Sequence, residues 1–226
     1  MSFDAPLPPY NASDPSATFL NSSCLDLLLI ELVPMAYRVV NEVDSTSSTG
    51  TSKDGKGGKA GHESVGSSVA KSSGGNVSGN GSGRKMDEEE ERDAVFFRLE
   101  MLGYRVGQGL VERFSRDRPR FTDTLDVIKF LCKDLWMLVF RKQIDNLKTN
   151  HRGVYVLTDN SFRPFARMST EAGGAAVVRA QPFLWFPCGV IRGALASMGI
   201  NATVQAETSE LPGATFQIKS VVIKGP

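Results

Sequence analysis

The residue types that carry most enzyme chemistry are scarce in this chain. It contains two histidines, His62 and His151, and three cysteines, Cys24, Cys132 and Cys188. A nucleophile paired with a histidine base would have to use His151, because His62 lies in a Gly- and Ser-rich segment that favours no fixed geometry. We therefore predict that the chain is not an enzyme, that it has no catalytic residue, and that His151 is a turn residue.

The spacing of these side chains also argues against a bound metal or cofactor. Three separated cysteines and one histidine outside the Gly/Ser segment give no paired metal ligands, so neither a metal nor a cofactor is expected. Residues 50–57 approach a phosphate-binding loop, but Gly57 stands after Lys56 where that loop needs a serine or threonine. We interpret Cys132 and Cys188 as small buried hydrophobic residues.

The composition is that of a globular protein with almost no net charge. It has 226 residues, 41% of them hydrophobic, and a formal net charge of +1, which gives no reason to propose nucleic-acid binding. The longest apolar run, residues 25–33, is shorter than the roughly 20 residues of a membrane span. Residues 1–11 lack the basic and apolar regions of a signal peptide, so we expect a cytoplasmic location.

A single domain with one long insertion is the predicted organisation. Residues 44–85 are rich in glycine and serine and contain no Phe, Trp, Tyr, Leu or Ile. Such a segment buries too little apolar surface to offset the entropy lost on ordering. We predict a flexible N-terminus over residues 1–22 and one domain over 23–226, interrupted by a disordered insertion at 44–85.

Hydrophobic periodicity predicts the elements that must position these residues. Apolar residues recur every three to four positions in four segments and alternate in four others. The predicted helices span about 23–43, 87–116, 122–142 and 177–198, and the predicted strands span about 153–158, 162–168, 201–208 and 214–223. The acidic run 87–91 suits a helix start, and Gly199 can end the last helix. The fold class is α+β, with two layers: four main helices packed on a four-stranded antiparallel sheet.

Two pairs of glycines interrupt the helical patterns. Gly103 and Gly107 are four residues apart, and so are Gly189 and Gly193, so each pair lies on one helical face. A helical glycine costs about 1 kcal/mol relative to alanine, so these positions need a reason. Close packing inside the domain and contact with another chain both provide one, and the sequence leaves both open.

The runs around these glycines resemble a known family. Residues 103–114, Gly-Tyr-Arg-Val-Gly-Gln-Gly-Leu-Val-Glu-Arg-Phe, and residues 188–195, Cys-Gly-Val-Ile-Arg-Gly-Ala-Leu, are similar to helix signatures of the small subunits of the transport protein particle (TRAPP) complex. Residues 126–129 continue the first of these signatures, and residues 129–136 and 141–157 resemble the subunit 6 branch of that family. The resemblance is weak over residues 23–44 and strong from residue 87 onward.

The resemblance implies a role in vesicle traffic. Subunit 6 pairs with the subunit 3-type paralogue, chiefly through the first two helices, within a complex of other core and large subunits. That complex tethers vesicles in ER–Golgi and Golgi traffic, on peripheral Golgi membrane, and activates Rab GTPases mainly through other subunits. The chain is then a non-catalytic scaffold, and its contact with a Rab GTPase is indirect.

A partner would cover the excess apolar surface of the first two predicted helices. Both helices carry more apolar residues than one buried stripe requires. Our predicted partner-binding residues are Leu28, Leu32, Met35, Val39, Phe97, Met101, Tyr104 and Gln108. For each of them, an ordinary place in the core is the competing explanation.

Two other functions remain as alternatives to a scaffold. The first is a hydrophobic-ligand or acyl-binding module, since related domains enclose apolar cavities. The family resemblance implies an acylated cysteine after the second helix of subunit 3, but residues 118–121 are Arg-Pro-Arg-Phe here, so lipid attachment is not expected. The second is a hydrolase that depends on His151.

Overall fold

The computed structural model describes residues 21–49, 86–150, 152–168 and 175–221. The predicted N-terminal segment and most of the predicted insertion lie outside these residues, as do His62 and His151. The helical elements are α1 (Ser22–Thr49), α2 (Glu88–Phe114), α3 (Thr124–Phe130), the π-helix η1 (Leu131–Leu135), α4 (Trp136–Phe140), the 3-10 turns η2 (Arg163–Phe165) and η3 (Gln181–Leu184), α5 (Ala175–Ala180) and α6 (Trp185–Ser197). The strands are β1 (Asn146–Thr149), β2 (Val154–Asp159), β3 (Ala202–Glu207) and β4 (Ala214–Ser220).

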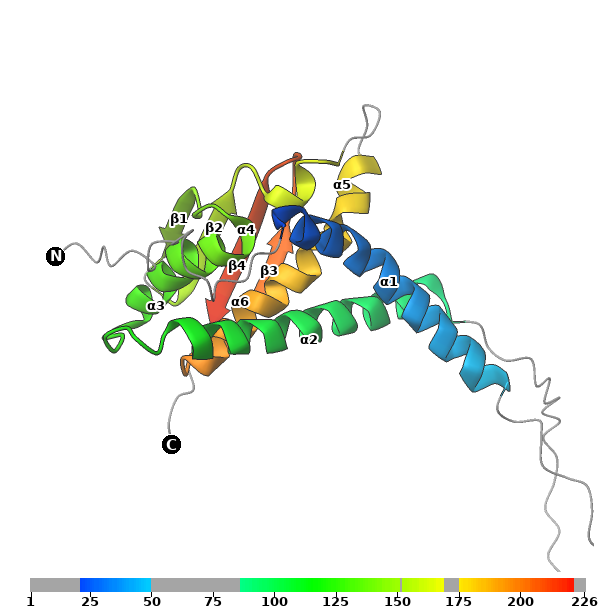
Figure 1. Ribbon diagram of the computed structural model, residues 1–226, viewed down its shortest axis with the longest axis horizontal. Helices are drawn as coiled ribbons and strands as arrows, with labels where there is room; N and C mark the ends of the chain where they lie inside the picture. The colour runs from blue at the N-terminus through cyan, green and yellow to red at the C-terminus, as the bar shows by residue number, and fades with distance from the viewer. Residues whose placement is uncertain (1–20, 50–85, 151, 169–174, 222–226) are drawn as a thin grey trace, which may run out of the picture.

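The four strands form one antiparallel sheet in the order β1-β2-β4-β3. Leu157 lies opposite Phe216, and Phe216 lies opposite Ala206, so three apolar side chains share one face across the sheet. The helices gather on that side, with α6 beside β3 and α2 packed on α6 (Figure 1). The predicted two-layer α+β fold with four main helical segments is confirmed.

One predicted strand is wrong, and a different segment takes its place. Residues 162–168 begin with the 3-10 turn η2, because Phe162 and Phe165 are both buried and a spacing of three points them to the same side of a turn. The fourth strand is instead β1, which forms a hairpin with β2. The side chain of Asn150 holds that hairpin, accepting hydrogen bonds from the N–H groups of Arg152 and Val154.

A buried polar network ties α4 to the end of β2. Asp159 is fully buried, and its carboxylate accepts hydrogen bonds from Trp136 Nε1 at 2.9 Å and Lys142 Nζ at 2.7 Å. The N–H of Ser161 is a third donor at 3.0 Å. All three donors surround one charge, which satisfies the requirement that a buried carboxylate be paired. Around it pack the aromatic rings of Trp136, Phe140, Phe162 and Phe216.

The helix ends follow from local side chains. Asp87 and Glu90 form a capping box at the start of α2, so the predicted acidic helix start is confirmed. At the end of α6, Gly199 adopts a positive φ of 79°, which a residue with a side chain rarely does. The C-terminal end of α1 lies beyond the predicted boundary at Val43, because the helix continues to Thr49.

The first helix is attached to the rest of the domain by a second, smaller core. Leu32, Val33 and Val40 of α1 pack with Val95 and Leu99 of α2. Further contacts hold α1 near its start and in its C-terminal half: Arg163 binds Asp26 with two hydrogen bonds of 2.8 and 2.9 Å, and Asn41 donates to Glu91 at 2.7 Å. The helix therefore lies across the N-terminal half of α2 (Figure 1), and several of its other apolar side chains are not covered by any part of the chain that the structure describes.

Candidate partner-binding face

The four glycines allow α2 and α6 to pack backbone against backbone where they cross. A Cβ atom at Gly103 would lie 2.1 Å from the carbonyl oxygen of Phe186, and one at Gly193 would lie 2.0 Å from that of Tyr104. Gly107 and Gly189 meet backbone in the same way, at 2.1 and 2.0 Å. All four are buried, so the structure places them in contact between two helices of this chain.

An ion pair borders the same crossing. The Arg192 guanidinium of α6 binds the Glu100 carboxylate of α2 through two hydrogen bonds, one of them from Nη2 at 2.6 Å. Arg192 also lies over the ring of Tyr104, with its Cζ 4.6 Å from the ring centroid. Because the Arg192 guanidinium is held by Glu100, its contact with the ring of Tyr104 fixes that ring at the flank of the α2–α6 crossing.

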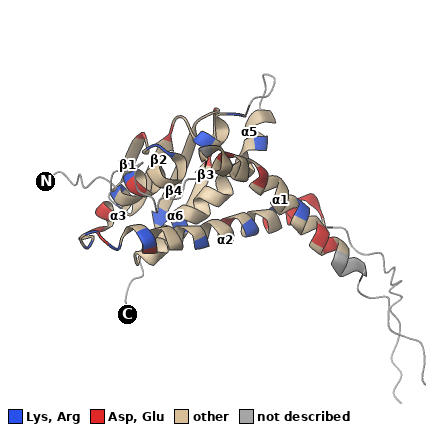
Figure 2. Cartoon of the chain, in the orientation of Figure 1, with Lys and Arg blue, Asp and Glu red and all other residues tan. Residues whose placement is uncertain are grey.

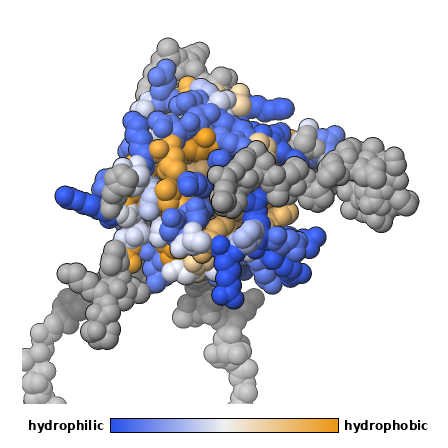
Figure 3. All heavy atoms as spheres, turned by 90° about the vertical axis from the view of Figure 1, so that its left-hand side faces the viewer, coloured by the Kyte–Doolittle hydropathy of each residue, from blue (hydrophilic) through white to orange (hydrophobic). Residues whose placement is uncertain are grey.

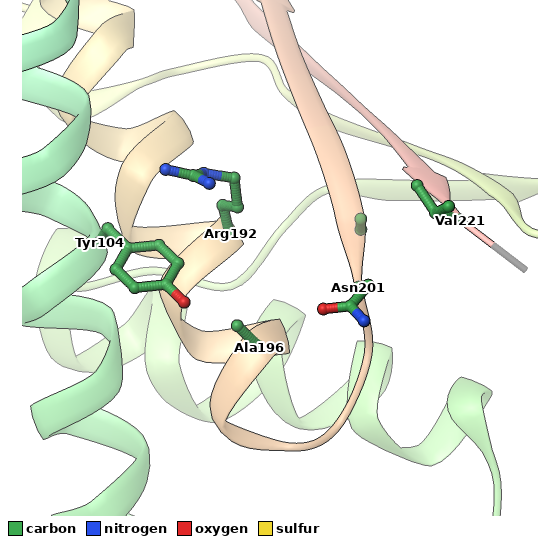
Figure 4. Close-up of a pocket in the computed structure, with 6 residues that line it drawn as sticks. Tyr104, Arg192, Ala196, Asn201 and Val221 are labelled. Carbon is green, nitrogen blue, oxygen red and sulfur yellow. The ribbon is translucent and has the colours of Figure 1, made fainter. Parts of the chain in front are cut away.

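Beside this pair lies a small hollow of about 320 Å³. It is lined by Tyr104, Arg192, Ala196, Asn201, Ala202 and Val221. Figure 4 shows the Tyr104 side chain from α2 and the Asn201 side chain, from the residue just before β3, pointing toward one another across it. Because Glu100 already binds Arg192, the hollow offers polar groups without an unpaired charge.

The predicted residues of α1 form a stripe with one buried member. Leu28, Leu32, Met35 and Val39 follow one another at intervals of four, three and four residues, the spacing of a helix–helix seam. Leu28 is 58% exposed and Met35 is also exposed, whereas Val39 is half-buried. Leu32 is only 6% exposed and packs in the small core against α2, so it supports the stripe from beneath.

The predicted residues of α2 repeat the same spacing along the flank beside its contact with α6. Phe97 is 63% exposed and Gln108 is exposed, while Met101 and Tyr104 are half-buried. The backbone of Tyr104 touches Gly193, and its ring touches Arg192. This side of α2 therefore offers one large uncovered ring, Phe97, beside residues already held within the domain.

Sequence reasoning missed further apolar residues on the same two helices. Among the described residues, the exposed large apolar side chains are Leu27, Leu28, Ile30, Met35 and Val43 of α1, Phe96, Phe97 and Val106 of α2, and, elsewhere, Val178 and Val221. Helical spacing alone could not separate them from the core, since both kinds of residue recur every three to four positions. Exposed apolar surface is thus concentrated on α1 and α2, where it marks a candidate binding face.

Other surfaces of the domain are more mixed. Positive and negative side chains are interspersed over the helices (Figure 2), in keeping with the net charge of +1. Seen from the end that holds α3 and β1, the surface is largely hydrophilic, with a smaller apolar area (Figure 3). The contrast makes α1 and α2 the strongest candidate for contact with another protein.

The described residues hold little that could do chemistry. Burial raises the pKa of the Cys132 and Cys188 thiols to about 12, so both stay protonated near neutral pH and are poor nucleophiles. In the described ranges, no three His, Cys, Asp or Glu side chains gather into a potential metal site. None of the described helices has the length and hydrophobicity of a membrane span.

The features above define a two-layer α+β domain whose first two helices leave apolar surface uncovered. Residues 25–221 match the family described as "Transport protein particle (TRAPP) component". The match spans most of the chain, and the chain belongs to this family.

Relatives in other organisms carry subunit names. The chain is 52% identical to "Trafficking protein particle complex subunit 6b" of Danio rerio over 130 residues, 58% of this chain and 82% of the relative. It is 48% identical to subunit 6A of Bos taurus over 120 residues, 53% of this chain and 74% of that protein. A solved structure of subunit 3 from Naegleria fowleri, covalently bound to palmitic acid, aligns with a TM-score of 0.49 and 16% identity, covering 57% of this chain and 82% of that one.

Proposed function

We propose that the chain is a non-catalytic scaffold subunit of a TRAPP complex. It pairs with a subunit 3-type relative through the exposed side of α1 and α2. In this proposal the complex tethers vesicles in ER–Golgi and Golgi traffic at peripheral Golgi membrane, and other subunits carry nucleotide exchange on the Rab GTPase. The names of the subunit 6 relatives support the assignment to the complex.

The concentration of exposed apolar side chains on α1 and α2 is the observation that supports pairing. Leu28 and Phe97 leave more than half of their surface in water, and burying one such side chain contributes about 1.5–3 kcal/mol. Stable obligate interfaces bury about 2,000 Å² or more and are more apolar than ordinary surface. On each of the two helices, the four-three-four spacing is that of a helix–helix seam, which suits packing against a partner helix.

The test replaces the most exposed residue of each predicted stripe. We expect the double variant Leu28→Asp, Phe97→Asp to lose co-purification with a co-expressed subunit 3-type relative, because two desolvated carboxylates would face an apolar partner. Circular dichroism should be unchanged, since both side chains are exposed. These positions give a cleaner test than Met101 and Tyr104, because Tyr104 also packs on Arg192 within the chain.

The matched control is Val178→Asp. Val178 is 71% exposed on α5 and belongs to neither stripe, so the same change of chemistry should leave pairing intact. Co-purification of the double variant at the wild-type level would show that the assigned face is wrong. Loss of pairing in the Val178 variant would show that added charge, rather than this face, weakens the complex.

A further inference from the structure

A second hollow lies at the far end of α2. It has a volume of about 750 Å³ and is formed where the end of α2, the connection to α3, the start of α3 and the end of α6 meet. The contacts between α1 and α2 involve the N-terminal half of α2, so this hollow is separate from the proposed partner-binding face. Its lining includes the run of residues 118–121 that sequence analysis singled out.

The floor of the hollow is apolar and recessed. Val111 of α2 and Val127 of α3 line it, and both are buried. The half-buried ring of Phe121 lies beside them, with its centroid 5.2 Å from that of Phe130. Only a group that projects into the hollow can reach such a floor, and an apolar side chain of matching size would gain from contact with it.

The rim is positively charged. Arg118 is held in place by Asp134 at 2.6 Å and by the ring of Phe130, whose centroid lies 5.0 Å from its Cζ. Arg116 and Arg120 also line the hollow and are exposed, and neither forms an ion pair with any described residue. Fixed and unpaired guanidinium groups around one opening favour ligands with carboxylate or phosphate groups.

Nearby carboxylates offset this charge only in part. Asp123 is the one acidic residue among those lining the hollow, and its Oδ1 accepts a hydrogen bond from the N–H of Asp126 at 2.7 Å. The exposed Asp117 lies between Arg116 and Arg118 in sequence but does not line the hollow. Arg118 is already paired with Asp134, so Arg116 and Arg120 against the one engaged carboxylate of Asp123 leave the opening positive.

We propose that this hollow binds an acidic peptide segment of a neighbouring protein. One large apolar side chain of the segment enters the hollow and contacts Val111, Val127 and Phe121, while flanking carboxylates bind Arg116 and Arg120. A flat membrane surface would meet the arginines but not the buried floor, so the shape favours a projecting side chain. The chain would then hold two partners, one at each end of α2, as a scaffold requires.

The test uses the full-length chain and labelled synthetic peptides. We expect a peptide of sequence Glu-Glu-Leu-Phe-Glu-Glu to bind in a fluorescence anisotropy titration. Two comparison peptides, one with glutamines for the glutamates and one with serines for the apolar pair, should each bind about tenfold more weakly, since each loses one component of the contact. Added salt should weaken binding of the first peptide and leave the glutamine version nearly unchanged.

Charge reversal locates the contact. The double variant Arg116→Glu, Arg120→Glu should lower affinity for the acidic peptide by at least about tenfold. Arg113→Glu is the matched control, because Arg113 is exposed on the last turn of α2 but does not line the hollow, and it should bind within about twofold of wild type. Unchanged circular dichroism and thermal unfolding would show that the variants are folded.

Three outcomes would overturn the proposal. The first is the absence of binding by the acidic peptide at millimolar concentration. The second is an equal loss of binding in the Arg113 variant, which would mean a general charge effect. The third is tighter binding to phosphatidylserine-containing vesicles that the double variant abolishes, which would assign the arginines to a membrane surface instead.

Discussion

The two sides of α2 differ in what covers them. On the side toward α6, glycines remove every side chain that would separate the two backbones, and the contact is closed within the chain. On the exposed side, Phe97 places a large ring in water and is 63% exposed. Packing on the first side stabilises the isolated chain, whereas the apolar surface on the second side contributes to stability only when a partner covers it.

This difference separates residues that the fold requires from residues that a partner would require. A change on the α6 side should destabilise or unfold the protein. A change on the exposed side should leave it folded but unable to pair with a partner. The size of the effect on the free energy of unfolding is therefore the most direct measure of the side to which a residue belongs.

The largest effect is expected at the glycine contact. In Gly193→Ala, the new methyl group would lie 2.0 Å from the carbonyl oxygen of Tyr104, and backbone on both helices would have to move. Overpacking of this kind typically costs about 1–3 kcal/mol, and more where backbone rather than a side chain must shift. We expect at least about 3 kcal/mol of destabilisation by urea unfolding, or no folded protein.

Gly109→Ala on α2, the other helix of this crossing, is the control. A Cβ atom there would have nothing within 4 Å, so only the gain in helix propensity remains. The variant should be about 0.5–1 kcal/mol more stable than wild type. Equal destabilisation by both alanines would mean that helix geometry, rather than contact with α6, governs these positions.

An intermediate effect is expected at the ion pair beside the crossing. Glu100→Gln keeps the shape of the side chain but removes the charge that binds Arg192. Arg192 is partly exposed and can regain water, so we expect a loss of about 1–2 kcal/mol in urea unfolding.

A smaller effect is expected on the exposed side of α2, where Phe97→Ser should change the free energy of unfolding by less than about 0.5 kcal/mol. A larger loss at Phe97 would place that ring in the fold rather than on a binding face.

The sequence predicted the parts of the fold that depend on local periodicity. Four helical segments, the glycine pairs, three of the four strands and the acidic cap of α2 all carry a signal within a few residues. β1 has no such signal, because Asn146–Thr149 contains a single large apolar residue and is a strand only by pairing with β2. Phe162 and Phe165 misled the prediction, since their aromatic rings are common in strands but here fill the core from a turn.

The candidate site was harder to predict for a physical reason. Apolar residues recur at helical spacing whether they face the core or a partner, so the sequence could not distinguish Leu32, which is buried, from Leu28, which is exposed. Nor could it show that all four glycines meet within the chain, because the α2–α6 contact joins residues about 90 positions apart. The charged hollow likewise exists only when the ends of α2 and α6 meet α3.

The smallest effect is expected at the attachment of α1, on which the open face depends. The hydrogen bonds from Arg163, and to a smaller extent its positive charge, hold the pKa of the Asp26 carboxyl below the usual range of an aspartate. A lowered pKa in the folded state means that the pair stabilises the protein at neutral pH and that this contribution is lost as the pH falls below about 4. Because both side chains are partly exposed, we expect less than about 1 kcal/mol.

Asp26→Asn isolates that contribution. The variant should be slightly less stable than wild type in urea at pH 7, and the two unfolding free energies should converge once the pH falls below the lowered folded-state pKa of Asp26, where the wild-type carboxyl is protonated. A gap that stays constant with pH would mean that the charge of Asp26 does not hold α1. If the gap closes and the neutral variant also pairs more weakly with the subunit 3-type relative, then the open face depends on α1 being fixed before the partner arrives.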